Sequence, residues 1–273
     1  MKNKIQKRFT TLILIALTIT SCKQQQRSSK EEVIIDEEVS EEIAVPPITL
    51  EKLQGSPAYA DAELQMNIPK TDKAINNGEI NFTFAVNNYE LGAQTKGQNA
   101  TLLANSDKGQ HIHFILDNQP YSAHYEPTFK KEIPDGVHHL VAFLSRSYHE
   151  SVKNENSVVV QKLEVGSNPK DTLGLTMDTP TLIYSRPKGT YSGKDTENLL
   201  LDFFVLNTKL SENGHKVRAT INGEEFMIAE WAPHIIQGLP KGEVTIQLEL
   251  IDAEGNLIPG PFNKVVRTVT LQQ

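Results

Sequence analysis

The sequence predicts an all-β protein in which two tandem copies of one β-sandwich repeat follow an N-terminal targeting segment and an acidic tether. Three observations lead to this fold class. Short apolar or alternating runs, typical of β-strands, recur with turn-forming residues between them. No long helical period appears among these runs. The runs of the first half return in the same order in the second half, which indicates a duplication.

Length and charge narrow the protein class. The chain has 273 residues, with 27 Lys and Arg against 34 Asp and Glu, and a formal net charge of −7. This length suits one or two globular domains. The acidic balance argues against a nucleic-acid partner, which requires a concentrated basic surface. A single cysteine leaves no internal disulfide, so each domain must be held together by its own apolar core.

Residues 1–21 read as a signal peptide. Basic residues from Lys2 to Arg8 precede an apolar run, Phe9 to Thr20, that is too short to span a bilayer. The run ends in Ile19-Thr20-Ser21-Cys22, which resembles the lipobox of bacterial lipoproteins. The resemblance implies cleavage before Cys22, lipidation of that residue, and a membrane partner reached through the lipid anchor. The position after the cysteine holds Lys23 instead of the aspartate that retains lipoproteins at the inner membrane in some bacteria, which favours the outer membrane of the cell envelope.

Residues 22–50 are predicted to form a disordered acidic tether. Seven carboxylates fall between Glu31 and Glu42, and Pro46-Pro47 close the stretch. Such a segment cannot bury enough apolar surface to fold alone.

The remainder divides into repeat one at 51–165, a linker at 166–180 and repeat two at 181–273. Three matched pairs of segments define the duplication: ELQMNIPK (63–70) with TLIYSRPK (181–188), GQHIHFILDNQPY (109–121) with GHKVRATINGEEF (214–226), and AHYEPTFKKEIPDGVHHLVAFL (123–144) with AEWAPHIIQGLPKGEVTIQLEL (229–250). About seven short strands in about 100 residues are typical of an immunoglobulin-like β-sandwich. The Cys…Trp…Cys hallmark is missing, so the likeness concerns architecture alone.

Six of the eight histidines lie between His111 and His149, in repeat one. The matched positions of repeat two carry Lys216, Arg218, Glu230, Val244, Thr245 and Gly255. The fold can therefore be built without these histidines, which weakens a purely structural explanation for them.

Strand phase places three of the histidines on one face. In repeat two Val217, Ala219 and Ile221 read as the core face, so in repeat one His111 and His113 point away from the core. By the same comparison His139 points outward, together with Ile115, Val141 and Phe143. An apolar, His-rich outer face predicts either a binding surface or a contact with the other repeat.

His111 and His113 form a candidate metal site. Residues i and i+2 of a strand stand roughly 6–7 Å apart on one face, so both imidazoles can reach one ion. A third ligand from a neighbouring strand, such as His139, would complete a tris-imidazole site for zinc or copper. His138 and His149 are further candidates. The alternative is a solvated or hydrogen-bonded set of rings with no metal.

The pattern Gly109-x-His111-x-His113, Asp117, Gly136-x-His138-x-Leu140 and a late His149 resembles an uncharacterised family of bacterial envelope domains. The resemblance covers about residues 109–165 and implies no established activity. Members are sometimes labelled phosphopeptide-binding, and the stretch LSRSYHESVK offers an anion candidate in Arg146, Ser147 and Lys153, since arginine forks onto phosphate oxygens. A solvated loop is the alternative.

No GxSxG, HExxH, P-loop or CxxC motif occurs, which predicts a non-catalytic protein. Three functions stay open. The first is an envelope lipoprotein that binds a ligand, a transition metal such as copper or zinc, on the His-rich face. The second is a structural or adaptor component whose face contacts an envelope protein partner. The third is an anion- or phosphopeptide-binding module.

Overall fold

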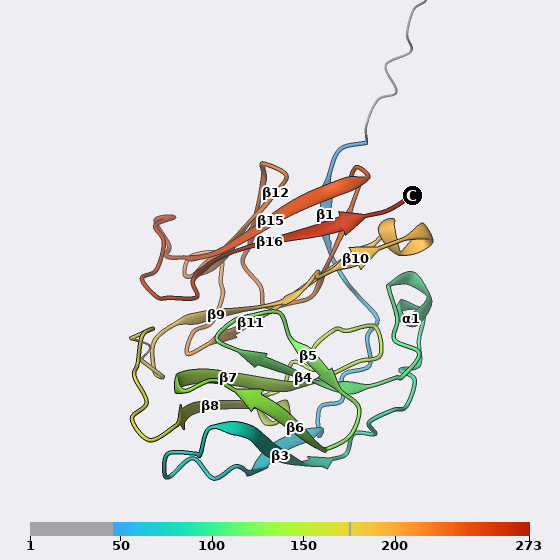
Figure 1. Cartoon of the computed structure of the whole chain (residues 1–273). Coiled ribbons are helices and arrows are strands. Elements are labelled where there is room, and N and C mark those ends of the chain that lie inside the picture. The colour runs from blue at the N-terminus through green and yellow to red at the C-terminus, as the bar shows by residue number, and fades with distance from the viewer. Residues whose placement is uncertain (1–45, 175) are drawn as a thin grey trace, which may run out of the picture. The chain divides into compact units, whose positions relative to one another are not determined.

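The structure is a computed structural model and describes residues 46–174 and 176–273. The predicted signal peptide, Cys22 and the tether up to residue 45 lie outside the described residues. Within the described ranges no helix is long and apolar enough to cross a membrane. The described chain is almost entirely β-structure, and the helical turns in it are short (Figure 1).

The first sandwich pairs a three-stranded sheet, in the order β2-β3-β6, with a four-stranded sheet, in the order β5-β4-β7-β8. All of its strand pairs are antiparallel. Its elements are β2 (Glu63–Ile68), β3 (Gly78–Asn87), α1 (Asn99–Leu102), β4 (His111–Leu116), β5 (Ser122–His124), β6 (Thr128–Ile133), β7 (Gly136–Ser145), η1 (Glu155–Ser157) and β8 (Val158–Val165).

The second sandwich repeats this plan with two additions. Its sheets have the orders β1-β14-β11-β9 and β10-β16-β15-β12-β13. The additions are β1 at one sheet edge and β10, which pairs in parallel with β16. Its elements are β1 (Thr49–Lys52), β9 (Thr181–Arg186), β10 (Thr190–Tyr191), η2 (Gly193–Thr196), β11 (Leu199–Leu206), β12 (Lys216–Ile221), β13 (Glu224–Ile228), β14 (His234–Gln237), β15 (Gly242–Ile251) and β16 (Lys264–Leu271). The predicted fold class, all-β with two tandem immunoglobulin-like sandwiches, is confirmed.

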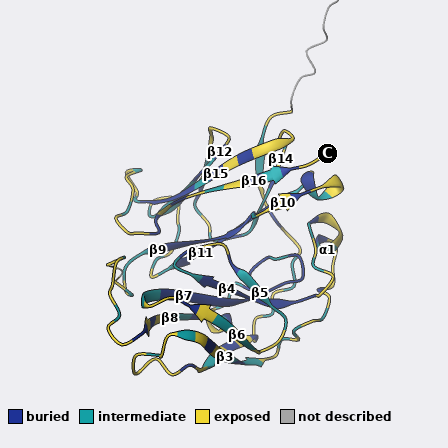
Figure 2. Ribbon diagram, in the orientation of Figure 1, coloured by how far each residue is buried: buried dark blue, intermediate teal, exposed yellow. Residues whose placement is uncertain are grey.

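The two sandwiches pack against each other, so that four sheets form successive layers (Figure 1). Ile115 on β4 and Phe143 on β7 form an apolar cluster with Ile183 on β9 and Phe204 on β11. The inner strands are therefore buried on both faces, as the continuous burial of β4 shows, whereas the outer strand β12 alternates (Figure 2). This explains why β11, and the part of β7 from Leu140 to Leu144, read as nearly unbroken apolar runs.

β1 corrects one predicted boundary. The sequence assigned residues 49–50 to the tether and residues 51–52 to repeat one, but Thr49–Lys52 pairs antiparallel with β14 of the second sandwich. Ile48 and Leu50 pack against the core of that sandwich, which gives this segment an apolar reason to add to the sheet edge.

The duplication extends to a turn in each sandwich. Asp117, at φ 52°, accepts a hydrogen bond from the backbone N–H of His139 through Oδ1 at 2.8 Å. Asn222, at φ 47°, accepts from the backbone N–H of Thr245 through Oδ1 at 2.9 Å. Asp and Asn tolerate the left-handed backbone of such turns. The two sandwiches therefore use the same side-chain-to-backbone hydrogen bond to fix this turn against the long strand that follows, β7 or β15.

Candidate functional site

His111 and His113 lie on β4 with the phase that the sequence predicts. Ile112 and Phe114 enter the core of the first sandwich, and the two histidines point away from it. Both histidines are nevertheless fully buried, because the second sandwich covers this face. Of the two predicted roles for the face, contact with the other repeat is the one observed, so the surface expected for an external envelope partner is covered by the protein itself.

A third histidine joins them, and the three imidazoles converge. His111 Nε2 lies 2.9 Å from His113 Nε2 and 3.1 Å from His149 Nδ1. One ligand atom from each ring falls within 4.8 Å of the others. Tetrahedral zinc with bonds of about 2.0–2.1 Å separates its nitrogen ligands by about 3.3 Å. The three rings could therefore hold a metal ion after small movements.

The opposite ring nitrogens fix how two of the imidazoles face the cluster. His111 Nδ1 lies 2.8 Å from the carbonyl oxygen of Gly109, which only accepts, so this nitrogen carries the proton and Nε2 keeps its lone pair. His113 Nδ1 lies 3.3 Å from Ser185 Oγ, on β9 of the second sandwich. Metal-binding histidines are commonly oriented by such contacts at their second nitrogen.

The turn that follows β7 presents His149. Its backbone φ is 70°, in the left-handed region, and its N–H donates to the carbonyl of Arg146 at 2.9 Å. The backbone N–H of Ser147 donates to Thr95 Oγ1 at 3.0 Å, and the Thr95 N–H donates back to Ser147 Oγ at 3.1 Å. A non-glycine residue at positive φ is held there by its surroundings, and such positions cluster at functional sites.

Burial keeps all three rings neutral. It lowers the pKa of His111 from 6.5 to about 4, and it lowers the pKa of His113 and of His149 well below 6.5. The positive charge of Arg186 lowers each pKa in addition. A neutral imidazole is the form that binds a metal, so the cluster is in its ligand form across the physiological pH range.

His139 does not belong to this cluster, contrary to the prediction. In the ladder between β4 and β7, His113 stands opposite Phe143, and Asp117 accepts from the backbone of His139 beyond the end of β4. Four residues along β7 separate His139 from Phe143, which is about 13 Å of strand. His139 instead packs near Phe262 of the second sandwich, and its Nδ1 has no hydrogen-bond partner among the described residues.

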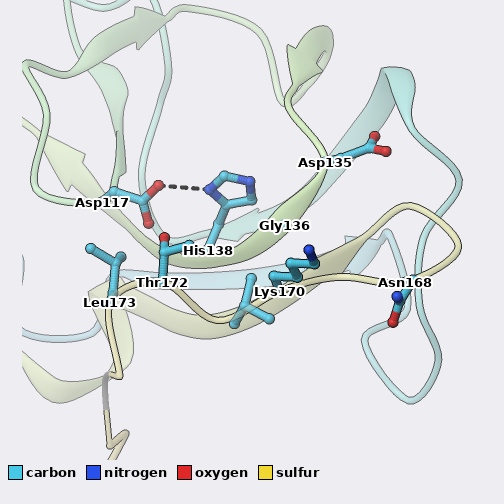
Figure 3. Close-up of a pocket in the computed structure, with 9 residues that line it drawn as sticks. Asp117, Asp135, Gly136, His138, Asn168, Lys170, Thr172 and Leu173 are labelled. Carbon is cyan, nitrogen blue, oxygen red and sulfur yellow. Dashed lines mark hydrogen bonds and ion pairs between the residues drawn. The ribbon is translucent and has the colours of Figure 1, made fainter.

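His138 is also unsuited to ligate a metal. Its Nδ1 donates to Asp117 Oδ2 at 2.6 Å, and its Nε2 donates to the Pro134 carbonyl at 2.9 Å, so both ring nitrogens are occupied. The pair lines a cleft of about 430 Å³ beside the linker, together with Asp135, Lys170 and other residues (Figure 3). Both ring nitrogens face hydrogen-bond acceptors of the protein, so neither is directed at a metal position.

The predicted anion residues are committed to internal contacts. Arg146 is buried, pairs with Glu150 Oε1 at 3.0 Å and donates to the carbonyls of Pro57 and Ser151. Ser147 is fully buried, and Lys153 pairs with the buried Asp202 at 2.5 Å. These groups form the scaffold of the His149 turn and of the contact between sandwiches, so they do not present a surface for a phosphopeptide.

Sequence reasoning missed the residues that surround the cluster from the second sandwich and from the connection between β4 and β5. Tyr121 stacks on His113 with ring centroids 3.5 Å apart, and its hydroxyl lies 3.3 Å from His149 Nδ1. Ser185 and Arg186 come from β9. Comparison of the two repeats could have identified Arg186. Repeat one has the apolar Ile68 at the matched position, so a charged residue there is peculiar to repeat two.

No protein-family model and no curated protein matches the chain. Among solved structures, the fibronectin(III)-like modules of Clostridium thermocellum CbhA align at 14% identity, over 77% of this chain and 94% of that chain, with a TM-score of 0.27. Bacteroides ovatus SGBP-B of a mixed-linkage glucan utilization locus, in complex with a mixed-linkage heptasaccharide, aligns at 11% identity, over 77% and 48%, with a TM-score of 0.21. Domains 4 and 5 of the S-layer protein SbsC align at 12% identity, over 78% and 98%, with a TM-score of 0.20. At these TM-scores the alignments assign no ligand and no activity to this chain.

Proposed function

We propose that this protein is a non-catalytic, lipid-anchored binding module of the bacterial cell envelope, and that its ligand is a transition metal ion held by His111, His113 and His149. The observation that carries the proposal is the convergence of three neutral imidazoles, the fully buried His111 and His113 and the half-buried His149, with nitrogens separated by 2.9 Å and 3.1 Å along the two hydrogen-bonded pairs. The anchor rests on the lipobox-like sequence that ends at Cys22.

Zinc and oxidised copper are the ions that suit this ligand set. Imidazole nitrogen is a preferred ligand of both, and the cluster offers neither a thiolate for a soft ion nor a carboxylate for calcium or magnesium. Three protein ligands also leave a coordination position open, unlike the four-ligand sites that zinc uses for structure alone.

The test uses the untagged mature chain, residues 22–273, with Cys22→Ser to prevent lipidation. Zinc and copper affinity would be measured by competition with a chromophoric chelator, alongside His111→Ala/His113→Ala and His149→Ala variants. We expect one equivalent of tightly bound metal in the parent chain, at least a hundredfold weaker binding in the double variant, and a clear loss in His149→Ala.

His215→Ala is the matched control, because His215 lies in the second sandwich, away from the cluster, where its Nδ1 hydrogen-bonds to Thr208. Its affinity should equal that of the parent chain. Parent affinity no tighter than that of the double variant would overturn the proposal.

A further inference from the structure

Arg186 is a buried cation without a counter-ion. Its side chain is 7% exposed, and among the described residues no carboxylate lies within ion-pair distance of it. One guanidinium nitrogen donates to the Tyr191 hydroxyl at 2.8 Å, and Nε is buried with no partner in the described chain. Burying an unpaired charge is costly, so a guanidinium in this state indicates that an anion belongs beside it.

Arg186 lies next to the His cluster, with Tyr121 at the contact. Its Cζ is 5.3 Å from the centroid of the Tyr121 ring, whose hydroxyl faces His149 Nδ1. Lys188 adds a second cation, with Nζ 4.0 Å from the same centroid. Burial lowers the pKa of Lys188, and the charge of Arg186 lowers it further.

Tyr121 does not supply the missing negative charge. Its phenolic hydroxyl is in its ordinary state a neutral group that can donate a hydrogen bond. Its ring stacks on His113 with an interplanar angle of 13°. A metal in the plane of the His113 ring therefore remains about one ring spacing from the Tyr121 oxygen, well beyond a bond of about 2 Å. The fourth coordination position is left to a ligand from outside the chain.

We propose that the metal centre carries a small planar oxyanion of the carboxylate type, coordinated at the open position and hydrogen-bonded by Arg186 and the Tyr121 hydroxyl. This inference rests on the proposed metal site. The planar guanidinium fork matches two oxygens of a carboxylate or bicarbonate. Tyr121 contacts both sides of the site, since its ring faces the Arg186 guanidinium and its hydroxyl lies 3.3 Å from His149 Nδ1. The negative charge of the anion offsets part of the positive charge of the metal and the two cations, which otherwise repel one another.

Cobalt(II) is the probe, because its visible spectrum reports a change of ligand at the metal. The chain of residues 22–273 with Cys22→Ser would be loaded with cobalt and titrated with acetate and with bicarbonate. Perchlorate at equal ionic strength is the non-coordinating reference. We expect both anions to change the spectrum and to tighten cobalt binding. A spectral response to only one of them would show whether the bound oxyanion is an organic carboxylate or bicarbonate.

Arg186→Gln separates the anion from the metal, because the two effects have opposite signs. Removing the charge should strengthen cobalt binding in perchlorate, since a repulsive cation is lost, and should weaken acetate binding at least tenfold. Arg267→Gln is the matched control: Arg267 also stands over a tyrosine ring, Tyr184, at 5.5 Å in the same sandwich. Arg186→Lys, which keeps the charge and loses the fork, should fall between the two.

The outcomes are distinguishable. Absence of cobalt binding would remove the metal site and this inference together. Cobalt binding without any response to acetate or bicarbonate, or equal anion affinity in Arg186→Gln and the parent chain, would overturn this inference and leave the metal site standing. If Arg186→Gln fails to fold, the anion affinity of Arg186→Lys is compared with that of the parent chain instead, and equal affinities would again overturn this inference.

Discussion

At the scale of single residues, similar side chains near the cluster have different roles because their partners differ. Arg146 and Arg186 are both buried, but Arg146 has Glu150 and two carbonyls, whereas Arg186 has one neutral hydroxyl. The sequence singled out Arg146, since it stands in a stretch rich in serine and lysine. Its partners Pro57 and Ser151 become neighbours only in the folded chain, so sequence alone could not show that its donors are used.

His139 illustrates the pH dependence of a buried ring. Burial lowers its pKa from 6.5 to about 4, so between these values the unfolded chain binds a proton that the folded chain does not. The free energy of unfolding should therefore fall as the pH falls from about 6.5 towards about 4. His139→Leu should reduce this loss, and at pH 7.5 it should be neutral or stabilising because it removes an unpaired buried nitrogen.

Urea unfolding of both proteins at pH 7.5 and pH 5 checks this prediction. The difference between the two pH values should be smaller in the variant. An equal loss of stability in the two proteins would show that His139 takes no part in the acid sensitivity.

At the scale of elements, the turn between β4 and β5 connects the two sandwiches. Asn118 Oδ1 accepts from the backbone N–H of Tyr184 at 2.8 Å, and Asn118 Nδ2 lies 3.3 Å from the Leu182 carbonyl. The duplication aligns this turn with Asn222-Gly223 of repeat two. It did not predict that this copy reaches into the second sandwich, because nothing local marks a contact across more than 60 residues of sequence.

Asn118→Gly tests the contact without straining the backbone. Glycine accepts the φ of 53°, so the variant removes the side-chain hydrogen bonds alone. We expect a loss of about 1–3 kcal/mol in the free energy of unfolding, because the buried N–H of Tyr184 is left unpaired. Asn88→Gly is the control: Asn88 has a φ of 54° and an exposed side-chain contact, to the Asp61 carbonyl. Equal effects of the two substitutions in chemical denaturation would show that the Asn118 side chain does not stabilise the contact between the sandwiches.

The same scale explains which parts of the site the sequence could predict. The alternation of β4 placed His111 and His113 correctly, since strand phase follows from two-residue periodicity. The choice of His139 as their partner was wrong because the ladder register sets Phe143, and not His139, opposite His113. The position of His149 depends on a turn in which its own backbone has a positive φ. A histidine in a polar stretch of sequence does not indicate such a turn, so its place in the cluster could not be predicted.

At the scale of the whole molecule, the contact between sandwiches should couple the metal site to the stability of both. The interface is apolar, through residues such as Phe143 and Phe204, whose rings lie 4.5 Å apart. All three histidines of the proposed metal site belong to the first sandwich, and Ser185 contacts one of them, His113, from the second. Sequence patterns indicated two similar domains but could not decide whether they unfold together.

Calorimetry with and without zinc tests this coupling. We expect one unfolding transition, and zinc at about 100 times its dissociation constant should raise the free energy of unfolding by about 2.7 kcal/mol. The whole transition should move to higher temperature, whereas His113→Ala should show no shift. Two transitions, of which zinc moves only one, would show that the sandwiches unfold independently.

β1 has a mechanical consequence. If the chain is held at Cys22, a pulling force reaches the described residues at the N-terminal side of Ile48 and loads the four paired residues of β1 against β14. This ladder passes the load into the second sandwich before any strand of the first is reached. The histidines that would hold the metal follow β1 in the chain, so they stay free of the tension on the anchor for as long as β1 remains paired.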